Sequence, residues 1–457
     1  MHETILNENK EFLDSVDNLI ELVSQMDKID QELYFQYNVK RGLRNSDGTG
    51  VLVGLTAIGE VHGYVIDDND KIPAEGNLLY RGIKLKELIE GSRREGRFGF
   101  EEICFLILFG KLPNKAELET FTRLLVSLRA LPQNFVEDMI KAPSPNIMNK
   151  MARAILTLYS YDSNADDLSL QNVLMQSISL IAKMPIIVAN SYSIKKYAYD
   201  NKSLVIHTHN PELSTAENFL YMLRPDRHFT KEEAEIIDLC LIIHAEHGGG
   251  NNSAFTTHVV SSSGTDTYAA ISAAINSLKG PLHGGAATTV AKMFSEIKEN
   301  VKDWENEEEI RAYVTKILNK EAFDKSGLVY GMGHAIYTLS DPRAVLLKEK
   351  AKELAKIKGA EKEFKLYDTV ERVTPEIFNA LKKTNKPLCA NVDFYSGFVY
   401  NLLGINEELF TPIFAMSRTV GWCAHRIEEI VSGGRIIRPA YKSITSKQHY
   451  IPLNERE

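Results

Sequence analysis

Apolar residues recur at steps of three and four along much of the chain, which is the spacing of one face of an α-helix. This pattern predicts helices over residues 100–108 and 152–158. It also predicts an amphipathic first helix, whose apolar face is formed by Phe12, Val16, Leu19, Val23 and Met26. Because helical periodicity dominates, the sequence predicts an all-α, mainly helical fold.

Two helix starts are marked by capping boxes, in which Ser or Thr is followed three residues later by Glu. They predict helices that begin after Ser214 and Thr230. The second helix should end at the glycines of residues 248–250, which places His244 and His247 in its last turn. The spacing of these histidines leaves zinc open. However, the chain has no HExxH sequence and no thiol nearby, so we expect no metal.

One segment departs from the helical pattern. Residues 51–67 alternate between apolar and polar positions and carry several glycines, which predicts a short β-hairpin. No sustained alternation of strands and helices follows, and the chain has neither a P-loop nor a GxGxxG sequence after a strand. A doubly wound nucleotide-binding fold is therefore not expected.

The composition is typical of a soluble globular enzyme, because 44% of the 457 residues are hydrophobic and 25% are charged. The length allows two domains, or one large helical domain with an insert. No apolar run approaches the roughly eighteen residues needed to span a bilayer, so no membrane association is expected.

The net charge of −8 is concentrated at the start of the chain. The first 35 residues hold two lysines and nine acidic residues, so the remainder is close to neutral. Because no basic run is interleaved with aromatic residues, no nucleic-acid partner is expected. The acidic start differs from an Arg-rich mitochondrial presequence and lacks the layout of a secretory signal. We therefore expect a cytoplasmic protein.

Two histidines lie in glycine-rich turns, His283 in GPLHGG and His334 in GMGH, where bare backbone lets a small substrate approach. His283 also precedes a helical run from residue 286, and the positive end of a helix keeps a nearby imidazole neutral. A neutral imidazole can still donate a hydrogen bond to a carbonyl oxygen that becomes an enolate. Alternatively, each histidine merely packs in a tight turn.

Asp393 stands between the apolar residues Val392 and Phe394, which should desolvate its carboxylate and raise its basicity. Such a group suits a general base. The competing interpretation is an N-cap for the helix that starts near Phe394. With two histidine donors, the base interpretation points to removal of a proton next to a carbonyl.

Cationic side chains accompany these motifs. Arg343 lies in a proline-bounded turn, where its guanidinium could fork onto a substrate carboxylate or pair with Asp341. Arg418 and Arg438 are further candidates, although either could be a surface arginine. At the predicted helix end, the dipole favours a charged His247, which suits an anionic ligand.

Five motifs resemble the citrate synthase family in their order and spacing: HAEHGGGNNSAF, GPLHGGA, GMGHAIY with DPR, NVDFYSG and SRTVGW. The resemblance runs from about residue 40 to residue 440. It implies a citrate-synthase-like fold with a large helical domain and a smaller, mobile helical domain. The large domain would comprise residues 1–283 and 399–457 and the small domain residues 284–398, with the active site in the cleft between them.

The resemblance also implies the reaction, a condensation of acetyl-CoA with oxaloacetate followed by hydrolysis of citryl-CoA in the tricarboxylic acid cycle. The enzyme would be an acyltransferase and a homodimer with shared active sites, with no cofactor apart from acetyl-CoA as substrate. Asp393 would take the methyl proton, His283 would stabilise the enolate, and His334 would polarise the oxaloacetate carbonyl. The residues implied to hold the substrate carboxylates are His247, Arg343, Arg418 and, across the subunit boundary, Arg438.

Three alternatives stay open. The nearest is 2-methylcitrate synthase, which uses propionyl-CoA, because one methylene changes binding by only about 1–3 kcal/mol. A non-catalytic helical interaction protein and a metal hydrolase built on His244 and His247 are more remote. One departure from the family is Ala287, which stands where many members have Asn. One supporting hydrogen bond is therefore expected to be missing.

Overall fold

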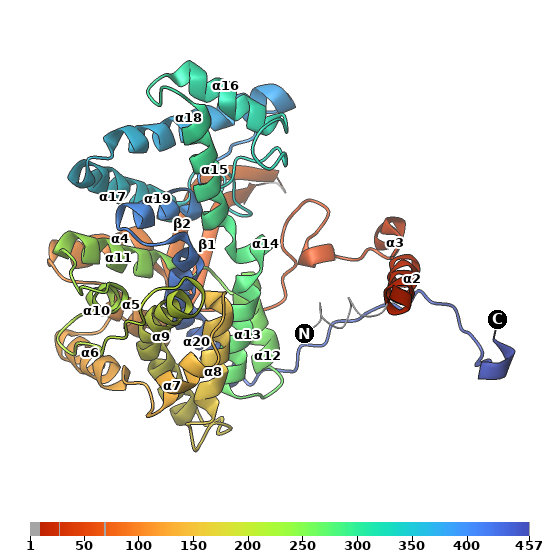
Figure 1. Cartoon of the computed structure of the whole chain (residues 1–457), viewed down its shortest axis with the longest axis horizontal. Helices are drawn as coiled ribbons and strands as arrows, with labels where there is room; N and C mark the ends of the chain where they lie inside the picture. Colours follow the sequence, from red (N-terminus) through yellow and green to blue (C-terminus); the bar gives the residue numbers. More distant parts are fainter. Residues whose placement is uncertain (1–9, 27, 68–69, 457) are drawn as a thin grey trace. The chain divides into compact units, whose positions relative to one another are not determined.

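The computed structural model describes residues 10–26, 28–67 and 70–456. The chain divides into two compact units, Met1–Leu55 and Thr56–Glu457, which are described separately. Figure 1 shows that helices account for most of the ordered structure, with strands confined to one small region. The predicted all-α, mainly helical fold is confirmed.

The described part of the first unit contains helices α2 (Lys10–Met26) and α3 (Gln31–Gln36) and the 3-10 helix η1 (Arg41–Leu43). The predicted first helix is therefore confirmed as a helix, although the side chains of Phe12 and Met26 lie outside the described residues. Leu19 and Val23 on α2 are 59% and 56% exposed. The described part of the apolar face is thus largely open to solvent.

Helices form nearly all of the second unit (Figure 1). They are α4 (Leu85–Arg94), α5 (Phe100–Phe109), α6 (Lys115–Leu128), α7 (Phe135–Lys141), α8 (Ile147–Tyr159), α9 (Leu170–Tyr199), α10 (Thr215–Leu223), α11 (Lys231–His244), α12 (Asn252–Ser261), α13 (Thr267–Lys279), α14 (Pro281–Gly284), α15 (Ala286–Asn300), α16 (Glu307–Leu318), α17 (Pro342–Lys358), α18 (Glu361–Lys382), α19 (Val392–Leu402), η2 (Glu407–Leu409), α20 (Phe410–Val431) and η3 (Leu453–Glu455). The helices predicted over residues 100–108 and 152–158 are confirmed as α5 and α8.

Helix α9 is the central apolar helix of this unit. It is long and apolar enough to cross a membrane, contrary to the prediction that no such run exists. However, 78% of its most apolar window is buried inside the protein, and it packs against α8, α10 and α20. Its hydrophobicity is therefore that of a core helix surrounded by other helices.

The strands within the described residues form one antiparallel sheet in the order β1–β2–β3. Their bounds are β1 (Gly59–Asp67), β2 (Asp70–Tyr80) and β3 (Ile83–Lys84). The hairpin predicted over residues 51–67 is only partly right, because this segment supplies β1 and the return strand follows it. The register between β1 and β2 shifts between His62 and Tyr64, which is a β-bulge at Gly63.

Both predicted capping boxes are confirmed. The hydroxyls of Ser214 and Thr230 accept hydrogen bonds at 3.3 Å from the backbone N–H groups of Glu217 and Glu233. These boxes begin α10 and α11. Helix α11 nevertheless ends at His244, before the glycines that were predicted to stop it.

The early end of α11 has a cause in α20. The carbonyl of His244 accepts a hydrogen bond from Arg418 Nε at 2.6 Å, and the carbonyl of Ala245 accepts one from the Gly421 N–H at 3.2 Å. Because α20 satisfies these carbonyls, the chain can leave the helix here. The prediction that His247 lies in the last turn is therefore wrong.

Candidate active site

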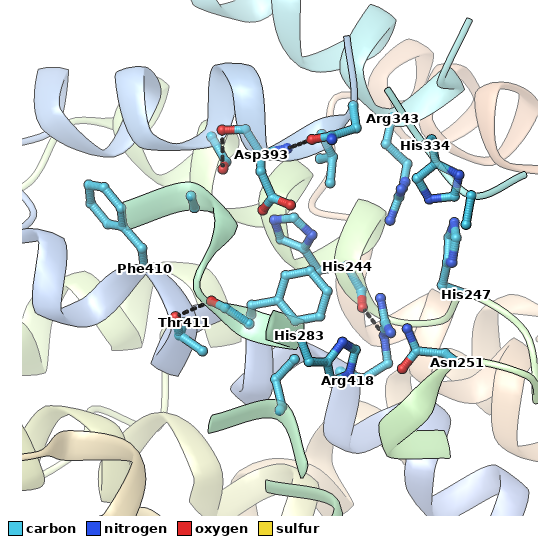
Figure 2. A pocket seen from close by; sticks show the side chains of 18 of the residues that line it. His244, His247, Asn251, His283, His334, Arg343, Asp393, Phe410, Thr411 and Arg418 are labelled. Atoms are coloured by element: carbon cyan, nitrogen blue, oxygen red, sulfur yellow. Dashed lines mark hydrogen bonds between the residues drawn. The ribbon is translucent and has the colours of Figure 1, made fainter. Parts of the chain in front are cut away.

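Most of the predicted site residues line one cavity of about 340 Å³. They are His247, His283, His334, Arg343, Asp393 and Arg418. These side chains come from different helices and connecting segments and converge on one space, as Figure 2 shows. The volume is in the range of small-molecule sites.

Arg438 is the exception among the predicted residues. It is exposed in the segment that follows α20, and it does not line the cavity of its own chain. The prediction that it completes the site of a partner subunit therefore stays a prediction.

Asp393 lies in the first turn of α19, but it does not cap that helix. The cap is Asn391, whose Oδ1 accepts a hydrogen bond from the Asp393 N–H at 3.0 Å, so the N-cap interpretation of Asp393 is wrong. Burial raises the pKa of the Asp393 carboxyl to about 6, although the nearby Arg343 opposes the shift. At neutral pH the group is thus an ionised carboxylate with increased basicity, as a general base requires.

His283 occupies the short helix α14, which begins at Pro281 and precedes α15. Its Nε2 lies 3.3 Å from the hydroxyl oxygen of Ser253. Burial, with a smaller contribution from Arg418, lowers the pKa of His283 to about 4. The predicted neutral imidazole is therefore supported, with burial as the main cause.

The backbone that follows His334 determines which of its ring nitrogens carries the hydrogen. Its Nδ1 accepts hydrogen bonds from the N–H groups of Ile336 and Tyr337, both at 3.1 Å. Burial and the nearby Arg343 lower the pKa of His334 to about 4, so the ring is neutral. Because Nδ1 is an acceptor in a neutral ring, the hydrogen is on Nε2, which is left as a donor.

The segment that places this proton is held by the β1–β2 hairpin. The Thr338 hydroxyl donates to the Gly63 carbonyl, and the Gly76 N–H donates to the Ser340 hydroxyl at 3.1 Å. A Cβ at Gly63 would lie 2.6 Å from the Cα of Tyr337, so only glycine allows this approach. The hairpin therefore helps to fix the backbone that orients His334.

Arg418 is the most notable cation of the site. It is only 1% exposed, and its Nε donates a hydrogen bond to the His244 carbonyl. Its Nη1 and Nη2 are buried and make no hydrogen bond to any described residue. Unpaired buried donors of this kind are costly, which indicates that an anionic ligand satisfies them.

The sequence left open whether Arg343 pairs with Asp341 or faces a substrate carboxylate, and the structure is consistent with both. Arg343 forms a buried ion pair with Asp341, with Nη2 to Oδ2 at 2.7 Å and Nε to Oδ1 at 3.0 Å. It also lines the cavity. Pairing with Asp341 therefore orients the guanidinium without removing it from the site.

His247 lies beyond the end of α11, with its ring centroid 5.2 Å from that of His334. Burial, followed by Arg343 and His334, holds the pKa of His247 well below its usual range. The expectation of a charged imidazolium is therefore wrong for this structure. Its buried Nε2 has no hydrogen-bond partner among the described residues, so it is open to a ligand.

Several cavity residues were not predicted as binding residues. They are Asn251, Tyr400, Phe410, Phe414 and His244, the last of which was weighed only as a metal ligand. The His244 ring packs on Phe414 with centroids 4.5 Å apart, and its buried Nδ1 finds no partner in the described part of the chain. Spacing from His247 was the only sequence feature that drew attention to it.

The zinc interpretation of His244 and His247 finds no support. Within the described residues, the group with metal-binding geometry comprises His258, His425 and Glu428, and it includes neither His244 nor His247.

Ala287 lines the cavity, so the departure from the family pattern lies in the site itself.

Comparison with known proteins agrees with the geometry. A family model described as the C-terminal domain of citrate synthase matches residues 46–440. Citrate synthase 2 of Bacillus subtilis is 35% identical over 408 residues, which cover 89% of this chain and 98% of that protein. The 2-methylcitrate synthase of Shewanella oneidensis is 31% identical, and the match covers 83% of this chain and 92% of that protein.

Solved structures give the same result. One is a ternary complex of citrate synthase from Thermoplasma acidophilum with carboxymethyl coenzyme A and oxaloacetate. It matches this fold with a TM-score of 0.74 at 26% identity, covering 92% of this chain and 99% of that chain. Because the match spans nearly all of both chains, and the family model covers most of this one, the chain belongs to the citrate synthase family of acyltransferases.

Proposed function

We propose that this chain condenses acetyl-CoA with oxaloacetate and hydrolyses the resulting citryl-CoA to citrate and CoA. One observation carries the proposal: Asp393, a base with a pKa of about 6, shares a cavity with neutral His283 and His334. The unpaired guanidinium nitrogens of Arg418 face the same enclosed space. A base, two donors and an anion site are what the condensation needs.

Oxaloacetate is a dianion, and the cavity offers two buried guanidinium groups, Arg343 and Arg418. Each can hold a carboxylate through charge-assisted hydrogen bonds. His247 adds a neutral donor through its unpartnered Nε2. In this arrangement the substrate keto oxygen accepts a hydrogen bond from Nε2 of His334.

The first chemical step is removal of a proton from the acetyl methyl group by the Asp393 carboxylate. The C–H electron pair becomes the double bond of an enolate, whose oxygen accepts a hydrogen bond from His283. Such a placed donor contributes about 3–4 kcal/mol in comparable oxyanion sites. The neutral state of His283 suits this role, because the ring donates without first requiring protonation.

The enolate carbon then attacks the keto carbon of oxaloacetate, and the keto oxygen takes the proton from Nε2 of His334. The backbone N–H groups of Ile336 and Tyr337 at Nδ1 stabilise the ring that has lost this proton. Water next adds to the carbonyl carbon of the citryl thioester, and its proton returns to Nε2 of His334. The carbon–sulfur bond then breaks, and the CoA sulfur leaves as the thiol with the proton that Asp393 took from the methyl group. In this scheme every donor and the base come from protein side chains, so the mechanism itself calls for no metal.

The proposal includes the wider organisation of the family. The chain would form a homodimer in which Arg438 reaches the partner's site, since citrate carries three carboxylates and the cavity supplies two guanidinium groups. Residues 284–398 would form the mobile small domain, and residues 1–283 and 399–457 the large one. A cytoplasmic location is supported by the free state of the four cysteines, which is typical of a reducing compartment.

Thiol release from acetyl-CoA, with and without oxaloacetate, tests the function. We expect release that depends on oxaloacetate and yields citrate. Release without oxaloacetate would instead indicate a simple hydrolase, and no release under either condition would exclude acetyl-CoA as the substrate. Either result would overturn the proposal.

The second candidate function is 2-methylcitrate synthesis from propionyl-CoA. It is favoured by one observation, the 31% identity to a relative that bears that name. The same assay with propionyl-CoA decides between them. A kcat/KM for propionyl-CoA above that for acetyl-CoA would make this the principal activity.

A further inference from the structure

A second group of titratable side chains lies outside the catalytic cavity. It joins His258 of α12 to His425 and Glu428 of α20. One ligand atom from each residue lies within 4.8 Å of those of the other two. None of the three lines the cavity, and the proposed reaction uses none of them.

The distances within this cluster fit the coordination of a small metal ion. His258 Nε2 lies 3.1 Å from His425 Nδ1, and Glu428 Oε2 lies 3.7 Å from the same Nδ1. Zinc binds nitrogen at about 2.0–2.1 Å with tetrahedral angles, which sets neighbouring ligand atoms about 3.3–3.4 Å apart. The two distances to His425 Nδ1 bracket this value, and the ligand atoms of His258 and Glu428 lie within 4.8 Å of each other.

In each imidazole, the ring nitrogen that points away from the cluster lies beside a carboxylate, as in metal sites. His258 Nδ1 lies 2.8 Å from Glu429 Oε2, and His425 Nε2 lies 3.0 Å from Glu246 Oε1. Metal-bound histidines usually donate their other N–H to a carboxylate in this way, which fixes the tautomer. Both inner nitrogens are then acceptors, and two acceptors facing each other at 3.1 Å need a proton or a metal ion between them.

The carboxylate of Glu428 is held in position to act as the third ligand. Its Oε1 accepts a hydrogen bond from the Ala57 N–H at 2.7 Å. Its Oε2, which faces the histidine pair, is buried and has no hydrogen-bond partner among the described residues. One oxygen is therefore anchored, while the other makes only the 3.7 Å ion-pair contact with His425 Nδ1.

An ion can reach the cluster because parts of it touch solvent. The His425 side chain is fully buried, but those of His258 and Glu428 are 14% and 17% exposed. Gly249 lies over the rings, where a Cβ would come within 3.5 Å of His425 Cε1 and 3.6 Å of His258 Nε2. Glycine at this position keeps the two rings uncovered.

We propose that His258, His425 and Glu428 bind a divalent transition-metal ion such as Zn²⁺, with water in the remaining position. Two imidazoles and one carboxylate are a ligand set that suits zinc and its neighbours in the first transition row rather than Mg²⁺ or Ca²⁺. The ion replaces the proton that the two rings otherwise share. It ties α12 to α20 beside the segment that carries His247, and it takes no part in the condensation.

Cobalt provides the direct test, because Co²⁺ in a tetrahedral nitrogen and oxygen site absorbs visible light far more strongly than hydrated Co²⁺. The full chain is stripped with a chelator, dialysed and titrated with Co²⁺. We expect intense visible bands that saturate at about one equivalent per chain and are bleached by added Zn²⁺. Absence of these bands in the folded wild type would overturn the proposal.

Three variants locate the ion. His258→Gln should lose the bands, whereas His228→Gln, which changes an exposed histidine outside the cluster, should keep them. Glu429→Gln removes only the carboxylate behind His258 and should weaken Co²⁺ binding about 10- to 100-fold. Unchanged bands in His258→Gln would refute the site.

Folding is checked in parallel by circular dichroism and thermal unfolding. Zn²⁺ should raise the Tm of the wild type and of His228→Gln, but not of His258→Gln. If His258→Gln does not fold, Glu428→Gln takes its place, because its amide oxygen can still accept from Ala57. Wild-type metal affinity in that variant would equally refute the assignment.

Discussion

The close approach of the β1–β2 hairpin to the segment after His334 leads to a prediction about Gly63. In Gly63→Ala the new Cβ would lie 2.4 Å from the carbonyl oxygen of Ile336 and 2.6 Å from the Cα of Tyr337, whereas ordinary contact begins at 3.4 Å. The backbone must therefore separate by about 1.0 Å at the closest contact, because the opposing atoms are main chain and cannot rotate away. The Tyr337 N–H is one of the two that orient His334.

A misplacement of about 1 Å at a catalytic group can reduce the rate about 100-fold. We therefore expect kcat of Gly63→Ala, measured by thiol release at saturating substrates, to fall by roughly two orders of magnitude. Stability should fall by about 1–3 kcal/mol, which is typical of overpacking. The matched control is Gly91→Ala in α4, where a Cβ meets nothing within 4 Å and activity should be unchanged.

The outcome is read only on folded protein, as judged by circular dichroism and Tm. If folded Gly63→Ala turned over at the wild-type rate, the hairpin would have no part in positioning His334. If its oxaloacetate affinity fell but kcat did not, the segment would serve binding rather than the orientation of the donor.

Four further predictions concern the base and the shared site. Asp393→Asn should lose most turnover yet still bind oxaloacetate; near-normal turnover would exclude Asp393 as the base. The folded state of the same variant should be more stable than that of the wild type at pH 7 by up to about 3 kcal/mol. The reason is that folding raises the pKa of the Asp393 carboxyl from 3.8 to about 6, so ionisation of this carboxyl favours the unfolded wild type. Chemical denaturation measures this gain, which should vanish towards pH 4, where the folded wild type is protonated. In the wild type, kcat/KM should fall about tenfold per pH unit below pH 6, as Asp393 takes up its proton; a flat profile to pH 5 would contradict this. Co-expressed Asp393→Asn and Arg438→Ala chains should recover activity in mixed dimers if Arg438 acts across the subunit boundary, and verified mixed dimers without recovery would refute the shared site.

The elements that the sequence predicted well are those set by local chemistry. Capping boxes at Ser214 and Thr230 mark helix starts because the side chain and the amide that it satisfies are three residues apart. The raised basicity of Asp393 was predicted from its apolar neighbours, and burial does raise its pKa. In both cases the interacting groups are close in sequence.

The errors arise where distant segments meet. The end of α11 depends on Arg418 and Gly421, which lie more than 170 residues further along the chain. The charge state of His247 depends on its burial and on Arg343, and the residues next to His247 in sequence predict neither. The tautomer of His334 was also not predictable, because it rests on the backbone geometry of a turn.

Asp341 shows why structural and functional interpretations of one residue need not compete. Its carboxylate pairs with Arg343, and Oδ1 also accepts the Arg343 N–H at 3.0 Å, which caps α17. Its Oδ2 accepts the N–H of Val392 at 3.2 Å, at the start of the helix that carries Asp393. One buried carboxylate thus joins the beginnings of α17 and α19. It thereby sets the positions of Arg343 and of Asp393, the proposed base, relative to each other. From the sequence, pairing with Asp341 was an argument against a role for Arg343. In the folded chain the same pairing holds the guanidinium rigid, so that less entropy is lost when a carboxylate binds.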